Sequence, residues 1–103
     1  MKKPIIVCLC GSTRFIETFA KVNLELTLAG KIVLSVGAVA HSDSQLGLSD
    51  EIKAKLDELH KRKIDLCDEV LVLNVGGYIG SSTRSEIEYA TKMGRPITYL
   101  ETP

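Results

Sequence analysis

Residues suited to binding an anion are concentrated between Asn74 and Glu86. An apolar run ends at Asn74, and glycines and hydroxyl residues follow it at Gly76, Gly77, Gly80, Ser81, Ser82 and Thr83. Glycines allow the backbone to approach a ligand closely, and the N–H groups at the start of a helix favour negative charge. We expect a helix to begin here with Glu86 in its first turn, which would place a carboxylate beside a bound phosphate or sugar.

A structural role for the same residues competes with this interpretation. The run Thr83-Arg84-Ser85-Glu86 fits a capping box, in which the glutamate reaches back to the backbone N–H of the N-cap residue. If Glu86 is a site residue instead, the positive end of the helix dipole is expected to favour its carboxylate form. That form suits a nucleophile more than a general acid.

A second polar loop follows the first apolar run of the chain. It consists of Gly11, Ser12, Thr13 and Arg14. Backbone N–H groups, hydroxyls and a guanidinium all suit a phosphate or a sugar hydroxyl. The loop is neither a Walker A sequence nor a GxGxxG motif, so it predicts neither an ATPase nor a dinucleotide enzyme. The alternative is a capped turn with a solvated arginine.

Strands and helices alternate along the chain and would position these loops. Apolar runs predict strands at residues 4–10, 32–36, 69–74 and 97–100, and periodic segments predict helices near residues 15–28, 49–67 and 86–93. We predict a single α/β domain over residues 1–103, of the three-layer Rossmann or flavodoxin-like kind, with a four-stranded parallel sheet in the order 2-1-3-4. This order brings both polar loops to the crevice at the carboxyl ends of the first and third strands.

Other side chains are candidates for moving a proton. His60 lies within the second predicted helix among basic residues, which are typical of a solvated helix face. Asp65 follows one turn later in the same helix. His41 and Asp43 lie in the aperiodic segment from residue 37 to 48, which is long enough to be functional.

Composition excludes several classes of partner. The formal net charge is zero, so we expect no nucleic-acid polymer as partner. No apolar run approaches the roughly 20 residues of a membrane span, and the first run is too short for a signal peptide, so we expect a cytoplasmic protein without a membrane partner. Cys8, Cys10 and Cys67 are predicted to be buried, unreactive thiols, because no CxxC and no zinc-type spacing occurs. We therefore expect neither a metal nor a cofactor.

The chain resembles the nucleoside 2-deoxyribosyltransferase superfamily, including its deoxynucleoside 5′-monophosphate N-glycosidases. Three features carry the resemblance: CGSTR at residues 10–14, a helix leading into DEVLVL at residues 68–73, and EIEYA at residues 86–90 followed by GRPI at residues 94–97. The resemblance implies cleavage or transfer of an N-glycosidic bond, with Glu86 as the nucleophile. It also implies that the two polar loops hold the sugar or its phosphate.

The chain departs from the family's pattern at several positions. Gly80 stands six residues before Glu86, where the family usually has an acidic or hydroxyl residue, although Ser81 and Ser82 are adjacent. His60 stands where the family has an aspartate before the third strand, and Asp65 follows it. The identity of the proton donor therefore stays open among His60, Asp65, His41 and Asp43. Members of the family also carry C-terminal residues that complete a neighbouring subunit's site, and because the sequence ends at Pro103 we expect this contribution to be missing or shortened.

Two alternative functions remain. Residues 76–86 also resemble the Gly-Gly-x-Gly-Thr-x-x-Glu motif of cytokinin-activating phosphoribohydrolases, with two serines inserted before Thr83. A non-catalytic nucleotide-binding module of the same fold is the other alternative. In every case we expect a small nucleoside or nucleotide as ligand. We also expect a homodimer or higher homo-oligomer, because the first predicted helix is apolar on more than one face.

Overall fold

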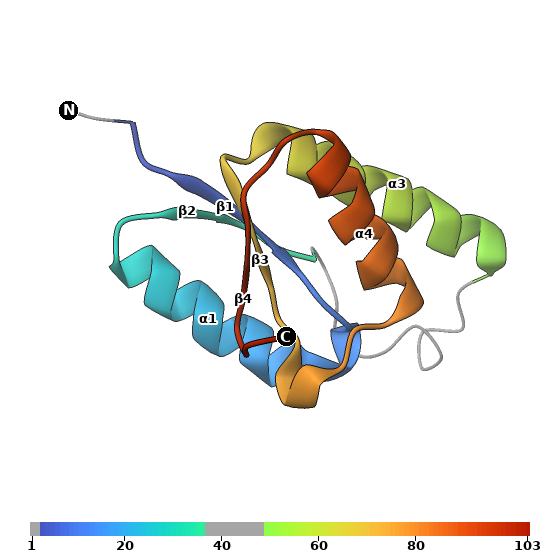
Figure 1. The fold of residues 1–103 in the computed structure, drawn as a ribbon, viewed down its shortest axis with the longest axis horizontal. Coiled ribbons are helices and arrows are strands. Elements are labelled where there is room, and N and C mark those ends of the chain that lie inside the picture. The colour runs from blue at the N-terminus through green and yellow to red at the C-terminus, as the bar shows by residue number, and fades with distance from the viewer. Residues whose placement is uncertain (1–2, 37–48) are drawn as a thin grey trace.

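The computed structural model describes residues 3–36 and 49–103 (Figure 1). Its strands are β1 (Ile6–Cys10), β2 (Ile32–Leu34), β3 (Glu69–Val72) and β4 (Ile97–Tyr99). All neighbouring strands pair in parallel, in the order β2-β1-β3-β4. The predicted fold class and strand order are therefore confirmed. Each strand is one or two residues shorter than the apolar run that predicted it.

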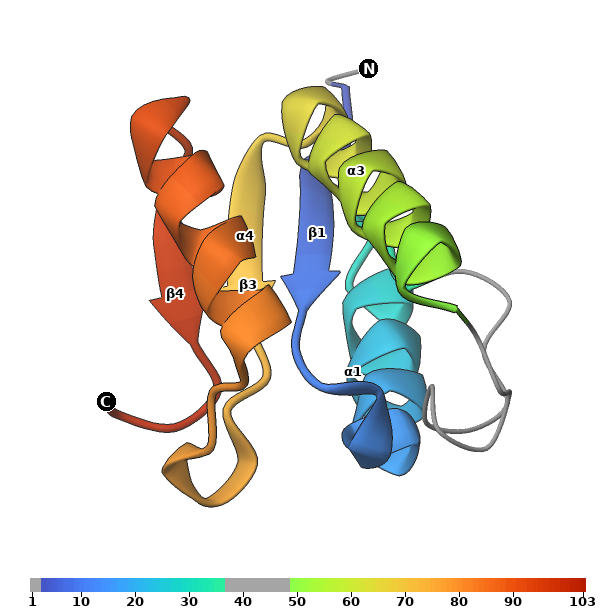
Figure 2. The same ribbon diagram turned by 90° about the vertical axis from the view of Figure 1, so that its right-hand side faces the viewer.

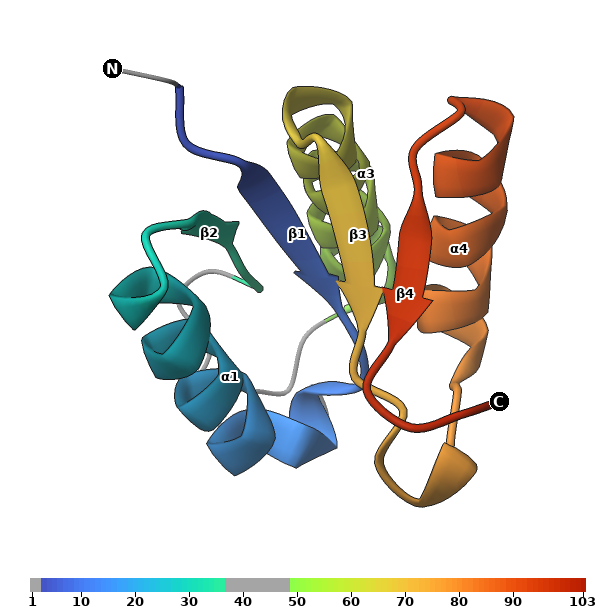
Figure 3. The ribbon, with the colours of Figure 1, turned by 60° about the vertical axis from the view of Figure 1, so that its left-hand side comes forward.

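Helices cover both faces of this sheet (Figure 3). Helix α1 (Ile16–Leu28) lies on one face, while α3 (Asp50–Leu66) and α4 (Ser81–Lys92) lie side by side on the other. Two 3₁₀ turns, η1 (Thr13–Phe15) and η2 (Val75–Gly77), follow β1 and β3. Both turns stand at the carboxyl edge of the sheet.

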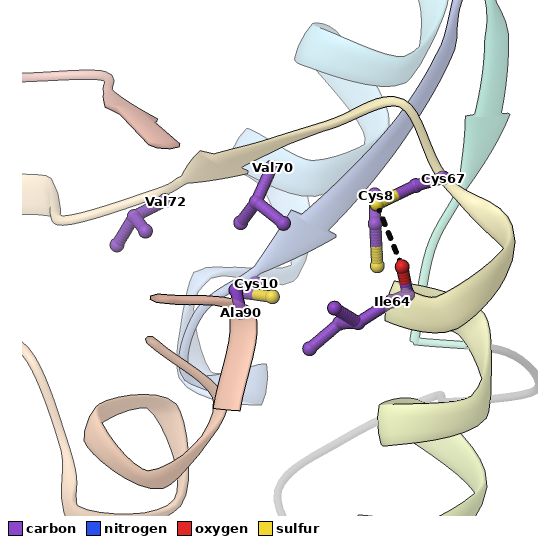
Figure 4. Packing of buried hydrophobic residues seen from close by; sticks show 7 residues of the cluster. All are labelled: Cys8, Cys10, Ile64, Cys67, Val70, Val72 and Ala90. Atoms are coloured by element: carbon purple, nitrogen blue, oxygen red, sulfur yellow. Dashed lines mark hydrogen bonds between the residues drawn. The ribbon is translucent and has the colours of Figure 1, made fainter. Parts of the chain in front are cut away.

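The apolar character of β1 follows from burial on both of its faces. Val7 and Leu9 pack with Phe19 on the α1 side. Cys8 and Cys10 pack on the side of α3 and α4, in a cluster completed by Ile64, Cys67, Val70, Val72 and Ala90 (Figure 4). Since successive side chains alternate between the faces of a strand, a strand covered on both faces has to be apolar throughout.

The ends of two helices follow from the local chemistry of their residues. The Ser49 hydroxyl accepts a hydrogen bond from the Ile52 backbone N–H at 3.2 Å, so Ser49 is the N-cap of α3. Helix α1 ends at Leu28, and Gly30 then adopts a φ of 87°, a left-handed conformation that glycine adopts readily.

The predicted capping box of the last helix is wrong. Helix α4 begins at Ser81, with Gly80 as its N-cap. Thr83 is therefore the third residue of the helix and Glu86 the sixth, in the second turn rather than the first. The physical reason is that glycine is itself an acceptable N-cap, so the helix begins earlier than the threonine. Glu86 is buried and does not cap the helix.

Part of the sequence interpretation lies outside the described residues. His41 and Asp43 fall between residues 37 and 48, outside the described residues. Among the helices of residues 3–36 and 49–103, none combines the length and the apolar character that crossing a membrane requires.

Candidate functional site

The two polar loops meet at the carboxyl edge of the sheet, as the strand order predicts. Both extend beyond the ends of β1 and β3 (Figure 2). The strand ends are linked by a hydrogen bond from the Leu73 N–H to the Cys10 carbonyl at 2.8 Å. A Cβ atom on Gly11 would lie 3.1 Å from the Leu73 carbonyl oxygen, so this close approach of the two chains favours glycine.

The loop after β1 forms a capped turn at the edge of the site. Ser12 is the N-cap of η1, and its hydroxyl accepts a hydrogen bond from the Arg14 N–H at 3.3 Å. Thr13 begins the turn, and Arg14 is exposed. The loop therefore has the capped geometry of the simpler alternative, and it also presents an exposed guanidinium at the carboxyl edge.

Tyr78 joins the two loops. Its ring lies 4.2 Å from the guanidinium carbon of Arg14 and packs edge to face against Phe15, with ring centroids 6.0 Å apart. Its hydroxyl lies 3.2 Å from the place that a Cβ on Gly80 would occupy. The side chain is nevertheless 41% exposed, so it offers an aromatic surface to a ligand at this edge.

The glycine turn after β3 already binds a carboxylate of the chain itself. Gly76 and Gly77 have φ values of 63° and 82°, the left-handed region that favours glycine. The Gly76 N–H donates a hydrogen bond to Glu101 Oε2 at 2.8 Å, and the Asn74 side chain pairs with the Glu101 backbone at 2.8 and 2.9 Å. The turn therefore stabilises an anionic group, and sequence reasoning did not identify Glu101 as its partner.

Ser81 and Ser82 open helix α4 beside this turn. Both are exposed and belong to the first turn of the helix. The first N–H groups of a helix have no acceptor within the helix itself. Backbone and hydroxyl donors at these two positions therefore face the same edge as the guanidinium of Arg14.

Glu86 and His60 are brought together beneath the two loops. The Nε2 atom of His60 lies 3.8 Å from Oε1 of Glu86, and the side chains are only 8% and 9% exposed. Within the described part of the chain, Oε1 of Glu86 has no hydrogen-bond partner. The interpretation of His60 as part of a solvated helix face is wrong. His60, Ile64 and Cys67 follow a spacing of four and then three residues, which places them on one buried side of α3.

Two cysteines complete this group. The Sγ atoms of Cys8 and Cys10 lie 3.7 and 3.5 Å from His60 Nε2. The predicted burial of the thiols is confirmed, since both are fully buried and free. Sequence reasoning missed their proximity to His60 because about 50 residues separate them. The only signal in the chain is that Cys8 and Cys10 share a strand face.

The buried environment raises the pKa of the acid in this group. Burial raises the pKa of Glu86 to about 7. The charge of His60 lowers this pKa, and the charge of Asp57 raises it further. The expectation that the helix dipole favours the carboxylate form of Glu86 is therefore wrong. Glu86 lies in the second turn, beyond the strongest part of the dipole, and is removed from water.

His60, Cys8 and Cys10 shift one another's pKa values. Burial alone would lower the pKa of His60, but the hydrogen bond with Cys8 and the charge of Glu86 outweigh it, and the pKa is raised. A hydrogen bond from the Cys10 thiol stabilises the Cys8 thiolate and lowers the pKa of Cys8 to about 5 despite burial. The same bond raises the pKa of Cys10.

The carboxylate of Asp65 contacts Tyr89 and Arg62 instead of Glu86. Its Oδ1 accepts a hydrogen bond from the Tyr89 hydroxyl at 2.5 Å, and its Oδ2 forms an ion pair with Arg62 Nε at 3.3 Å. The structure therefore brings His60, and not Asp65, against Glu86.

A hollow of about 200 Å³ lies on the other side of the sheet. It is lined by Ile16, Phe19, Ala20, Asn23, Ser35 and Val36, between α1 and the segment after β2. Ligand pockets typically hold about 300–1,000 Å³. Because the hollow includes neither Glu86 nor His60, we assign the chemistry to the carboxyl edge of β1 and β3 instead.

No protein-family model and no curated protein matches the chain. The resemblance to nucleoside 2-deoxyribosyltransferases therefore rests on the sequence features given above.

Proposed function

We propose that the protein cleaves or transfers the N-glycosidic bond of a deoxynucleoside or its 5′-monophosphate, with Glu86 as the nucleophile. The observation that carries this proposal is the buried Glu86 carboxylate beside His60, at the strand edge where ligands of parallel sheets bind. Strongly shifted pKa values in such a crevice are typical of functional sites. The sequence resemblance supplies the class of substrate.

The reaction follows from the pairing of an acid with an imidazole. The Glu86 carboxylate attacks the anomeric carbon, so that a carbon–oxygen bond forms while the carbon–nitrogen bond to the base breaks. The electron pair of that bond leaves with the base, and protonated His60 supplies the proton that the departing base needs. A water molecule then hydrolyses the glycosyl ester and returns a proton to His60. If a second base attacks instead, the reaction is a transfer.

The shifted pKa values of Glu86 and His60 support these roles at neutral pH. With a pKa of about 7, a substantial fraction of Glu86 is ionised at pH 7 and is a better nucleophile than an ordinary carboxylate. The raised pKa of His60 keeps a proton available for the base. Of the donors that the sequence left open, His60 is therefore the one we assign.

The surrounding groups suit a phosphorylated sugar. Arg14 offers a charge-assisted hydrogen bond to a 5′-phosphate, and the hydroxyls of Ser12, Ser81 and Ser82 add further donors. The N–H groups at the start of α4 favour the same negative charge. The exposed face of Tyr78 provides an apolar surface on which a base can stack.

A non-catalytic nucleotide-binding module is the second candidate. Two observations favour it: the Glu86 side chain is only 9% exposed, and the Gly76 N–H is already bonded to Glu101. A module of this kind would bind the nucleotide through the outer groups of the site without bringing the anomeric carbon to Glu86.

Incubation with a panel of deoxynucleosides and their monophosphates distinguishes these candidates. The protein is kept in EDTA, and the free base is followed by chromatography. Release of base, with or without an added acceptor base, supports the enzyme. Binding detected by calorimetry without any release of base supports the module.

We further propose that the protein works as a homodimer or higher homo-oligomer in the cytoplasm. On α1, Leu24 and Leu28 are 59% and 79% exposed and lie one turn apart. Large apolar side chains that share one exposed helix face are typical of a surface that another chain covers. The free cysteines agree with a reducing compartment.

A further inference from the structure

Two thiols and an imidazole converge at the centre of the site. The Sγ atoms of Cys8 and Cys10 and the Nε2 atom of His60 all lie within 4.8 Å of one another. The two sulfur–nitrogen distances are 3.7 and 3.5 Å. Tetrahedral zinc, with bonds of about 2.3 Å to sulfur and 2.0 Å to nitrogen, separates these ligand atoms by about 3.5 Å. The two sulfur–nitrogen distances therefore match the spacing that a single metal ion requires.

The side chains are held in this arrangement by two different elements. Cys8 and Cys10 point from β1 to the same side of the sheet, as Figure 4 shows for their sulfur atoms. His60 comes from α3, which packs on that side. Because the cysteines are fully buried and His60 is 6% exposed, the packing of the fold fixes the positions of all three.

The carboxylate of Glu86 lies next to this group, on the His60 side, but is not one of the three atoms that lie within 4.8 Å of one another. The buried Oε1 atom of Glu86 lies 3.8 Å from His60 Nε2 and accepts no hydrogen bond within the described residues. A buried carboxylate oxygen without a partner is costly. A small shift of this side chain toward a cation held by Cys8, Cys10 and His60 would satisfy it.

We propose that Cys8, Cys10 and His60 bind Zn²⁺, and that a shift of the Glu86 side chain toward the ion supplies the fourth ligand of a tetrahedral site. Two thiolates, an imidazole and a carboxylate are a ligand set that suits zinc. On binding, the thiols lose their remaining protons to solvent, His60 binds through the lone pair of Nε2, and Glu86 binds as the carboxylate. The ion would join β1 to α3 and α4.

The inference goes beyond the proposed function and does not depend on it. A zinc ion coordinated by Glu86 and His60 occupies both the nucleophile and the proton donor. Zinc would therefore inhibit glycoside cleavage rather than assist it. Metal binding is measured without nucleotide and cleavage is measured in EDTA, so that the failure of one proposal is distinguished from the failure of the other.

Titration of the reduced, EDTA-treated protein with Co²⁺ tests the site. Cobalt replaces zinc in tetrahedral sites and shows sulfur-to-metal charge-transfer absorption when thiolates are bound. We expect one Co²⁺ per chain, with this absorption, and its displacement by one equivalent of Zn²⁺. Zinc should also raise the melting temperature, because it binds only the folded state.

Single substitutions assign the ligands. C8S, C10S and H60Q should each weaken metal binding at least about 100-fold, since even partners outside the ligand shell change affinity 10- to 100-fold. E86Q should shift the cobalt spectrum and weaken binding by a smaller factor. C67S is the matched control, because Cys67 is also buried and free but lies outside the group of ligand atoms.

Each variant is first shown to be folded by circular dichroism in EDTA, so that a loss of metal binding is not caused by unfolding. Loss of cobalt–thiolate absorption in C8S and C10S, with retention in C67S, supports the site. If C8S or C10S does not fold, H60Q provides the same comparison from the helix side. Wild-type protein without thiolate absorption at stoichiometric Co²⁺, or equal binding by wild type, C10S and H60Q, would overturn the proposal.

Discussion

The Glu86 carboxylate and the His60 imidazole form a buried pair, with Oε1 and Nε2 separated by 3.8 Å. Each comes from a different helix, and each side chain is less than one-tenth exposed. Removing such groups from water costs free energy unless hydrogen bonds compensate, yet this oxygen of Glu86 lacks one within the described residues. The pair is therefore better explained by chemistry at the site than by a contribution to stability.

The stability of the metal-free protein should depend on the protonation of Glu86. Its pKa is about 7 in the folded protein, above the ordinary value of 4.5, so the folded state retains a proton that the unfolded state loses. The stabilising effect of this proton is fully present below pH 4.5 and is lost as the pH rises through about 7. The raised pKa of His60 acts in the same direction.

Glu86→Gln should therefore match wild type near pH 4 and be more stable at pH 8. We expect a difference of about 3 kcal/mol in the free energy of unfolding at pH 8. Urea unfolding in EDTA at several pH values measures it. The charged groups that act on Glu86 are His60 and Asp57 from α3 and Cys8 and Cys10 from β1. A variant less stable than wild type at pH 8 would mean that the Glu86–His60 ion pair stabilises the fold.

Arg14 should determine the preference for a phosphorylated substrate. Its exposed guanidinium lies over the Tyr78 ring at the carboxyl edge, where a 5′-phosphate would bind. Arg14→Gln should raise KM for a nucleoside monophosphate about 10- to 100-fold, since a hydrogen bond to a charged group contributes about 1.5–3 kcal/mol. KM for the unphosphorylated nucleoside should change little.

Lys92→Gln is the matched control for this charge, because Lys92 lies in the last turn of α4, far along the helix from Ser81. Steady-state kinetics of both variants on both substrates complete the comparison. An equal rise in KM for nucleoside and monophosphate in Arg14→Gln would show that Arg14 does not bind the phosphate.

The exposed leucines of α1 should form a subunit interface. Wild type is expected to be a dimer or larger by light scattering at micromolar concentration. Replacing Leu24 and Leu28 together by serine should give a monomer that is still folded by circular dichroism, because both side chains are exposed in the isolated chain. Leu66→Ser, at a leucine of α3 that is 67% exposed, is the control and should keep the wild-type mass. A monomeric wild type would contradict the proposed assembly.

The fold could be predicted from the sequence because each strand and helix is indicated by a short run of neighbouring residues. An unbroken apolar run such as β1 requires cover on both faces, and the alternation with helices then favours a parallel sheet. The N-cap of α3 at Ser49 and the end of α1 before Gly30 also depend only on a few neighbouring residues. The start of α4 was misjudged because both Gly80 and Thr83 are acceptable N-caps, and sequence alone does not choose between them.

The centre of the site was not predictable in the same way. Its geometry depends on which side of α3 faces the sheet. The charged neighbours of His60 make this side difficult to identify from the sequence. The basic neighbours suggested solvent, whereas the spacing to Ile64 and Cys67 places His60 in the core. The contacts between Cys10, His60 and Glu86 exist only after three elements pack together. The raised pKa of Glu86 likewise results from burial, which a helix position alone does not reveal.

The role of Glu86 as the nucleophile is tested by comparing the release of free base by wild type and Glu86→Gln, in EDTA, on the nucleotide that the panel identifies. Gln has nearly the shape of Glu but cannot form the glycosyl ester. We expect release by wild type and a loss of at least about 1,000-fold in kcat for a folded Glu86→Gln, equivalent to about 4 kcal/mol in the barrier. Wild-type-like turnover by that variant would contradict the assignment of Glu86 as the nucleophile.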